Sequence, residues 1–304
     1  MRVVSLVPGA TETVFALGRG SCLVGVSHEC DFPPEAKMLP VVTHPRVAAA
    51  GASYEIDQQV RAAVAAGEPL YDIDAELLRA LSPELVLAQD RCEVCALPAH
   101  TVEQLVQRLG FPVTVVRLHA HDLESLLADI QRIARALRCA SQGEELAGKM
   151  RAEIAAVART VQRARYRPRV LCLEWLDPPM VAGNWMPALV ECAGGQAVLS
   201  RAGEESRSTS WSSIAQAGPE VVVLMPCGFT MERTMAEVER LRSHAEWPSL
   251  PAVRHGRVYV VDGNAYFNRP GPRIVDSLRI LAGLVQPGLC ARWLPPGTWE
   301  RIEP

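Results

Sequence analysis

Short runs of apolar residues, bounded by proline and glycine, recur along the whole chain. Segments in which apolar positions have helical spacing lie between them, which is the pattern of strand–helix units that build mainly parallel sheets. Each run has the length of a buried strand. The predicted strands are Val3–Val7, Leu23–Val26, Leu85–Ala88, Val113–Val116, Val170–Leu173, Val221–Met225 and Val258–Val261.

Three helices can be placed from the same pattern. Thr11–Leu17 follows a Pro-Gly pair and is followed by Gly18, a residue that suits a helix C-terminus. Asp122–Cys139 carries apolar residues every three or four positions, with Asp122 as the expected N-cap. The pattern continues over 142–165, which predicts a helix of roughly 20 residues, about 30 Å long.

These elements predict an α/β fold in which two Rossmann-like lobes are joined by a long helix. We expect an N-terminal α/β lobe over residues 1–125, connecting helices over 126–167 and a C-terminal α/β lobe over 168–304. A rigid helical connector would allow only a small hinge closure between the lobes. The length of 304 residues and the apolar content of 49% agree with two packed cores.

The charge balance excludes some classes of partner. The chain carries 31 Lys and Arg against 34 Asp and Glu, so it has no excess of positive charge for a nucleic acid or an anionic membrane. The longest uncharged apolar runs are far shorter than the roughly 20 residues of a transmembrane helix. Residues 2–8 form a predicted strand rather than a leader, so the chain as given is expected in the cytoplasm; a removed leader would make it periplasmic or extracellular.

A series of motifs in a fixed order carries a family resemblance. The motifs are Arg2–Pro8, Ala10–Glu12, Leu23–Ser27, Asp31–Pro34, Ser82–Val86, Asn184–Gly195, Trp211, Gly218–Val221 and Arg269–Arg273. Over essentially the whole chain, this order resembles the helical-backbone (class III) substrate-binding proteins of ABC importers. Their ligands include cobalamin, iron-siderophores and haem, and the resemblance is strongest to the members that bind vitamin B12.

The resemblance implies a cleft between two lobes, in which loops at strand ends grip a bulky planar cofactor. A corrinoid such as cobalamin is the first expectation, and an iron-siderophore or haem is an alternative. The protein would be a soluble carrier or an importer binding protein, with a small-molecule metal complex as its partner. Core packing is the alternative role for each candidate aromatic residue. These residues are Trp175, Trp185, Trp211, Phe229, Tyr266 and Phe267, and Trp211 matches a cleft residue of the B12-binding members.

The sequence departs from the B12-binding pattern in three ways. Glu29 and His44 stand where those members have aromatic cleft residues, so they are candidate ligand-binding residues of a different chemistry. Glu76 matches the acidic residue with which the first lobe docks, but the second lobe has no matching acid, which leaves docking to an ABC permease open. The segment 54–70 is an insertion whose apolar spacing predicts an added amphipathic helix.

Five residues form a candidate metal site. His28 and Cys30 follow one predicted strand, Cys92 and Cys95 follow another, and Cys227 ends a strand of the second lobe. If these loops open on one cleft, their thiolates and imidazole could bind Zn²⁺ or an iron–sulfur cluster. A disulfide or reducible pair at Cys92 and Cys95, or inert thiols, are the alternatives. The odd total of nine cysteines does not resemble the disulfide framework of a small secreted domain.

The remaining chemistry favours binding over catalysis. His28 and His44 could ligate a metal ion, such as the cobalt of a corrinoid, and a surface or capping role is the ordinary alternative. The chain has no nucleophile elbow, no phosphate-binding glycine loop and no His-Glu-x-x-His zinc motif, so a binding protein is the simpler interpretation. A metalloprotein with redox or enzymatic chemistry in the same cleft is the competing hypothesis.

Overall fold

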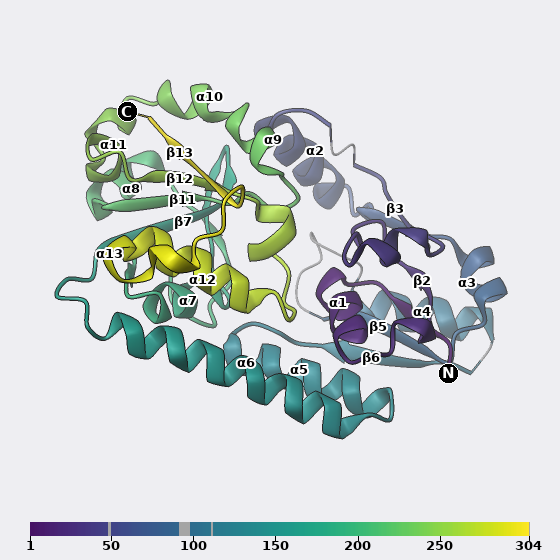
Figure 1. Cartoon of the computed structure of the whole chain (residues 1–304). Helices are drawn as coiled ribbons and strands as arrows, with labels where there is room; N and C mark the ends of the chain where they lie inside the picture. Colours follow the sequence, from purple (N-terminus) through teal and green to yellow (C-terminus); the bar gives the residue numbers. More distant parts are fainter. Residues whose placement is uncertain (48–49, 91–97, 111, 304) are drawn as a thin grey trace.

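The computed structural model describes residues 1–47, 50–90, 98–110 and 112–303. It has two α/β lobes side by side, with a pair of long helices along the base of both (Figure 1). The N-terminus lies on the first lobe and the C-terminus on the second. The expected α/β fold of two lobes with a helical backbone is confirmed.

The first lobe is built on a four-stranded parallel sheet in the order β2-β1-β5-β6. Its strands are continuous apolar runs because side chains are buried on both faces of the sheet. A separate antiparallel pair, β3 and β4, follows β2 in the chain. The strands are β1 (Val3–Ser5), β2 (Leu23–Val26), β3 (Thr43–Pro45), β4 (Tyr71–Ile73), β5 (Leu85–Gln89) and β6 (Thr114–Leu118).

Helices complete the first lobe. They are α1 (Pro8–Ala16), α2 (Ser53–Ala65), α3 (Ala75–Leu81) and α4 (Ala99–Leu109), with short 3₁₀ turns η1 (Gly20–Cys22) and η2 (Pro34–Met38). Helix α1 begins three residues earlier than predicted, because Pro8 suits the first helical position. Helix α2 lies in the inserted segment, where an amphipathic helix was expected.

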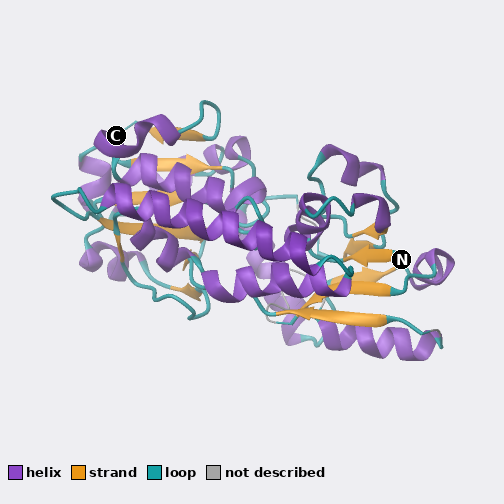
Figure 2. Cartoon of the chain, turned by 60° about the horizontal axis from the view of Figure 1, so that its bottom comes forward, coloured by secondary structure: helices purple, strands orange, loops and turns teal. Residues whose placement is uncertain are grey.

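Two helices form the backbone between the lobes, α5 (Leu123–Ala136) and α6 (Ala140–Val161). Asp122 caps α5 as predicted, because its carboxylate accepts the backbone N–H of Ser125 at 2.7 Å. Figure 2 shows the pair running from one sheet to the other. Helix α6 packs on α5 and on three helices of the second lobe, so the connector is part of both cores rather than a free linker.

The second lobe is built on a larger mixed sheet. Its centre is three parallel strands in the order β7-β11-β12, and β8, β10 and β13 extend it in antiparallel pairing. The short strand β9 pairs with β7 in parallel. The strands are β7 (Arg169–Leu176), β8 (Pro179–Val181), β9 (Gln196–Ala197), β10 (Arg207–Ser208), β11 (Val221–Leu224), β12 (Val258–Val261) and β13 (Trp299–Ile302).

Helices pack on both faces of this sheet and enclose two further apolar cores. They are α7 (Met186–Cys192), α8 (Trp211–Ala217), α9 (Met231–Met235), α10 (Val238–Arg242), α11 (Pro251–Arg254), α12 (Ile274–Val285) and α13 (Pro287–Cys290), with short turns η3 (Trp247–Ser249), η4 (Gly263–Phe267) and η5 (Ala291–Trp293). None of the helices in the described ranges combines the length and the apolar composition needed to cross a bilayer.

Candidate functional site

The carboxyl ends of parallel strands in the two lobes meet at the interlobe boundary. The loop after β2 carries Asp31, and the turn after β12 carries Asn264, whose side-chain amide donates to Asp31 at 3.3 Å. Ligands of open α/β sheets bind outside the carboxyl ends of the strands. The interlobe boundary is therefore the candidate functional site, and its side chains come from loops far apart in the sequence.

An ionic cluster of Glu12, Asp31, Arg269 and Arg273 joins the lobes at this boundary. Glu12, on α1, accepts two hydrogen bonds from Arg273 at 2.9 and 2.6 Å, and Arg269 lies 3.7 Å from the same carboxylate. Arg269 also forms an ion pair with Asp31. The side chains of Glu12 and Arg269 are only 3% and 5% exposed. Their burial is tolerated because two guanidinium groups and two carboxylates neutralise one another.

The ionic cluster also shifts the protonation equilibria of its members. Burial acts to raise the pKa of Asp31, but the hydrogen bond and the charge of Arg269 outweigh it, so the pKa is lowered. Burial acts to lower the pKa of Arg269, but the carboxylates of Asp31 and Glu12 outweigh it, so the pKa is raised. The ion pair of Asp31 with Arg269 therefore stays charged at neutral pH.

A close backbone contact lies next to the ionic cluster. A Cβ atom on Gly9, the second residue of α1, would lie 2.2 Å from the carbonyl oxygen of Pro270. A Cβ atom on Gly271 would lie 2.9 Å from the Cα of Gly9. Glycine is required at both positions because any side chain would push the two backbones apart. The second lobe thus touches the first turn of α1 directly.

Aromatic side chains of the second lobe pack where β7 ends. Trp175 contacts Phe229 edge-on, with the ring centroids 5.3 Å apart, and the guanidinium of Arg233 lies 3.7 Å above the Phe229 ring. Phe229 is fully buried, whereas Trp175 is half-buried. The indole Nε1 of Trp175 has no hydrogen-bond partner among the described residues. A buried donor without a partner is costly, and Trp211 Nε1 and His244 Nε2 carry the same cost elsewhere in the second lobe. A ligand would gain affinity from Trp175 Nε1 only where it reaches this buried atom.

A second aromatic group spans both lobes. The guanidinium of Arg273 lies 3.9 Å from the ring centre of Phe32 in the first lobe and 5.4 Å from that of Tyr266 in the second. Phe32 is 40% exposed, so part of its ring is open to solvent at the boundary. Arg273 therefore has two roles at the boundary, in the ion pair with Glu12 and in contact with these rings.

His28 presents a neutral imidazole in the loop after β2. Its Nδ1 lies 2.7 Å from Thr43 Oγ1, and its ring packs against Tyr71 with centroids 5.4 Å apart. Burial lowers the pKa of His28, Glu29 opposes this shift, and His44 adds to it. Thr43 holds Nδ1, and Nε2 lies 3.5 Å from Glu29 Oε1. A metal ion bound by Nε2 would therefore also meet the carboxylate of Glu29.

The thiol of Cys30 is held inside the first lobe. The Thr11 hydroxyl donates to its sulfur at 3.0 Å, and the Ser27 hydroxyl lies 3.2 Å from it. Burial raises the pKa of the Cys30 thiol, and these hydrogen bonds offset the rise only in part. A thiol that resists ionisation is a poor metal ligand, since the thiolate is the species that binds.

The predicted metal site has no support within the described ranges. These contain no group of three His, Cys, Asp or Glu side chains placed to hold a metal ion. Cys227 is half-buried and is a free thiol. Cys92 and Cys95 lie outside the described residues, so the proposed set of four thiolates stays a prediction.

Comparison with known proteins agrees with this two-lobed geometry. Residues 3–265 match the family model described as periplasmic binding protein. The chain belongs to the periplasmic binding protein family. The vitamin B12-binding protein of Vibrio parahaemolyticus is 27% identical over 284 residues, which cover 91% of this chain and 86% of that protein.

Solved structures of periplasmic binding proteins have the same fold. The periplasmic haem-binding protein RhuT from Roseiflexus sp. RS-1, in apo form, is similar with a TM-score of 0.71 and 27% identity, over 95% of this chain and 98% of that one. The periplasmic vitamin B12-binding protein BtuF of Vibrio cholerae has a TM-score of 0.67 at 19% identity, over 94% of this chain and 96% of that one. The family resemblance found in the sequence is confirmed.

The candidate ligand residues of this periplasmic binding protein fall into groups by burial. Glu29, Trp175 and Tyr266 are half-buried, and His44 is exposed on β3. Phe267 is fully buried, and its carbonyl oxygen accepts from the Nε1 of half-buried Trp185 at 3.0 Å. The structure thus brings Trp175 and Phe229 together in the second lobe. In the facing first lobe, His28 lies beside Glu29.

Trp211 lies inside the second lobe. Its ring stacks on His244 with centroids 4.7 Å apart and contacts Trp247 edge-on at 5.8 Å. Trp211 is 7% exposed and packs in an apolar core with residues of the same lobe. In this conformation its contacts are those of a core residue, which was the alternative role for the aromatic candidates.

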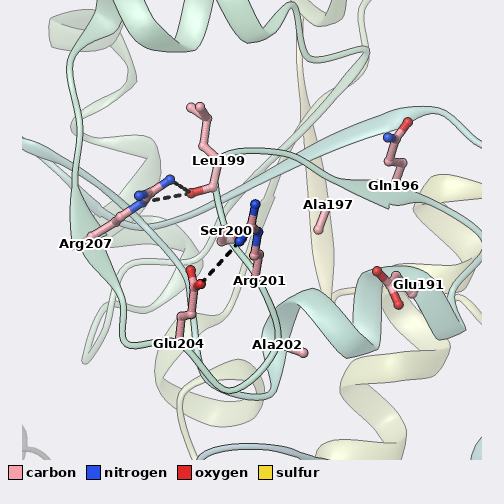
Figure 3. A pocket seen from close by; sticks show the side chains of 9 residues that line it. All are labelled: Glu191, Gln196, Ala197, Leu199, Ser200, Arg201, Ala202, Glu204 and Arg207. Atoms are coloured by element: carbon pink, nitrogen blue, oxygen red, sulfur yellow. Dashed lines mark hydrogen bonds and ion pairs between the residues drawn. The ribbon is translucent and has the colours of Figure 1, made fainter.

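An open pocket of about 580 Å³ lies on the second lobe and is lined by none of the boundary residues above. Figure 3 marks interactions for three of its charged side chains, Arg201, Glu204 and Arg207, and none for Glu191. Arg207 donates to the carbonyl oxygen of Leu199 at 3.0 and 2.8 Å, and Arg201 lies 4.0 Å from Glu204. The interlobe boundary is the stronger candidate site because the carboxyl ends of parallel strands from both sheets meet there.

Sequence reasoning assigned no contact to several residues of the boundary. Glu12, Phe32 and Arg273 occur in the motifs that carried the family resemblance, but their pairing spans 261 positions between Glu12 and Arg273. The available signal was local: Glu12 is the single charged residue of the first helix, and two arginines flank Pro-Gly-Pro. A buried carboxylate needs a cation, so this combination could have indicated the ion pair.

Proposed function

We propose that this periplasmic binding protein binds a bulky planar metal complex between its lobes, with a cobalamin-like corrinoid as the first candidate. The observation that carries the proposal is Trp175, a half-buried indole that lies beside Phe229 at the carboxyl end of β7; its Nε1 is itself buried and has no partner among the described residues. An apolar face next to a polar edge suits a macrocycle with amide substituents. The neutral imidazole of His28 lies in the facing lobe and could bind the metal.

The comparisons support two ligand candidates. The relative in Vibrio parahaemolyticus is named a vitamin B12-binding protein, which favours a corrinoid. RhuT is equally similar in sequence and is named a haem-binding protein, so haem is the second candidate. Both ligands are planar metal macrocycles, and they differ in their peripheral groups: cobalamin carries amides and haem carries carboxylates. The unpartnered indole N–H can donate to either kind of oxygen.

The partner and the location follow from the family. We infer that the protein delivers its ligand to an ABC permease and, if a leader precedes the chain, that it does so in the periplasm. Glu76, the residue matched to a docking acid, is exposed on α3. An exposed carboxylate can pair with a cation of a permease, mainly to orient the encounter.

Ligand titration of the purified protein tests the proposal. All six tryptophans lie between residues 175 and 299, so their fluorescence reports on the second lobe. We expect cyanocobalamin or haemin to quench this fluorescence to saturation at one ligand per chain. Replacing Trp175 by Phe keeps an aromatic ring and removes the N–H, which should lower the affinity roughly 3- to 10-fold.

Trp299→Phe is the matched control, because Trp299 lies on the edge strand β13 against Tyr259. This variant should bind with the affinity of the wild type. The proposal fails if neither ligand binds, and Trp175 loses its role if Trp175→Phe binds as tightly as Trp299→Phe.

A further inference from the structure

Helix α2 belongs to the first lobe by sequence, but its first turn is bonded to the second lobe. The backbone N–H of Ser53 donates to Glu237 Oε1 at 2.6 Å, and the Ser53 hydroxyl donates to Glu237 Oε2. Glu237 lies just before α10 and is 8% exposed. Ala52 precedes the helix and has no side-chain oxygen, so a carboxylate of the other lobe takes the place of an N-cap.

A second hydrogen bond joins the same two segments. Arg233, on α9, donates to the carbonyl oxygen of Gly51 at 3.1 Å. Gly51 has a φ of 118°, in the region that favours glycine, so the turn before α2 depends on this residue. Figure 1 shows α2 beside α9. We call the bonds of Gly51 and Ser53 to Arg233 and Glu237 the α2 anchor.

The α2 anchor is connected to the candidate ligand site through Arg233. The guanidinium that holds Gly51 also covers the ring of Phe229 at 3.7 Å, and Phe229 packs against Trp175. Helix α2 in addition approaches β7, the strand that carries Trp175. Displacement of α2 would remove a fixed partner of Arg233 and loosen the cover of Phe229. The position of α2 therefore affects how accessible Phe229 and Trp175 are.

We propose that α2 is a gate over the interlobe ligand site. The α2 anchor holds the gate closed, and ligand enters and leaves when the anchor opens. The effect of the gate on ligand association and dissociation rates rests on the proposed function. The closed position of α2 does not, because it is a property of the chain without ligand. Two experiments therefore separate the gate from the ligand.

Hydrogen exchange of the ligand-free protein tests the anchor. Glu237→Gln keeps the size of the side chain and removes its charge, and we expect the amides of α2 to exchange roughly tenfold faster than in the wild type. Ser53→Ala removes only the hydroxyl bond and should give a smaller increase. Glu239→Gln, whose side chain is 85% exposed, is the control and should exchange like the wild type. Equal exchange of α2 in Glu237→Gln and the wild type would overturn the gate.

Stopped-flow fluorescence with cyanocobalamin and haemin tests the kinetic consequence. A gate that opens more often should raise the association and dissociation rates together, roughly severalfold in Glu237→Gln, with a smaller change in affinity. A rise in the dissociation rate alone would make α2 a fixed wall of the site and would overturn the gate. If the wild type binds neither ligand, the proposed function fails, and the exchange experiment still decides whether α2 is anchored.

Discussion

The carboxylate of Glu12 shows how one residue can hold two lobes together. It is 3% exposed and faces two guanidinium groups that come from a loop more than 250 residues away in the chain. Replacing a buried ion pair by apolar groups can be neutral, but removing one partner leaves the other charge buried without compensation. The contribution of Glu12 therefore depends on Arg269 and Arg273 being present.

We expect Glu12→Gln to lower the free energy of unfolding by about 3 kcal/mol or more, because Arg269 and Arg273 keep their burial and lose a carboxylate. Urea unfolding at pH 7 measures the change. Glu145→Gln removes an exposed helix ion pair with Lys149 and should change stability by less than about 0.5 kcal/mol. Similar midpoints for the two variants would contradict the role given to Glu12.

His28 provides a test by pH. Burial lowers its pKa in the folded state, so the unfolded chain binds the proton more readily. The contribution to stability is therefore complete above the unfolded pKa of about 6.5 and is lost as the pH falls through the lower folded pKa. We expect His28→Gln to weaken the decline of the urea midpoint between pH 8 and pH 5. The exposed His255, changed to Gln, should leave that decline intact, and a decline unaltered by His28→Gln would exclude this role.

At the level of elements, two glycines of α6 have opposite environments. A Cβ atom on Gly143 would lie 2.3 Å from the Cβ of Ala134, because α5 and α6 pack closely there. A Cβ atom on Gly148, one and a half turns along the same helix, would meet no atom within 4 Å. The first glycine thus permits the helix pair to form, and the second only weakens α6.

Alanine at these two positions should therefore act in opposite directions. Gly143→Ala forces the helices apart and should lower the free energy of unfolding by about 1–3 kcal/mol. Gly148→Ala should raise it by about 0.5–1 kcal/mol through helix propensity. Thermal unfolding followed by circular dichroism measures both. A stabilised Gly143→Ala would show that the helix contact is looser than described.

A helix or strand could be predicted from the sequence where its own residues determine its structure. All seven predicted strands are present, since a buried parallel strand is a short apolar run and needs no partner to be recognised. The strands β3, β4, β8, β9, β10 and β13 were not predicted. They are short or lie at sheet edges, and polar residues such as those of Arg207–Ser208 form a strand only because a neighbour is in register.

At the level of the whole molecule, α5 divides its apolar residues between the two lobes. Leu126, Leu127 and Ile130 pack in the core of the second lobe. Ile133, further along α5, and Leu137, which follows its last residue, pack in the core of the first lobe. The same helix therefore stabilises both sheets, and loss of order in one lobe should be felt in the other.

We expect Ile133→Ala to destabilise both lobes together. The cavity in the first lobe should cost about 2–5 kcal/mol. Tryptophan fluorescence, which arises only from the second lobe, should show the same lowered urea midpoint as far-UV circular dichroism. If the fluorescence midpoint stays at the wild-type value while the circular dichroism midpoint falls, the lobes unfold independently.

The candidate site was less predictable than the fold. Its residue types were visible, and Trp175, Phe229 and His28 were proposed from the sequence. The contacts between the lobes were not, because Arg233 meets Gly51 and Glu237 meets Ser53 only after the lobes have packed. A contact across 184 positions leaves no local pattern, so the arrangement of the boundary required the structure.

The division of α5 between two cores has a consequence for any attempt to dissect the chain. A fragment that starts at residue 168 would contain the complete second sheet, yet it would lack Leu126, Leu127, Ile130, Met150 and Val157, which fill one side of its interior. That uncovered apolar surface would favour aggregation of the isolated half. Co-expression of residues 1–167 with residues 168–304 should instead yield a non-covalent heterodimer, since the first fragment carries the missing wall.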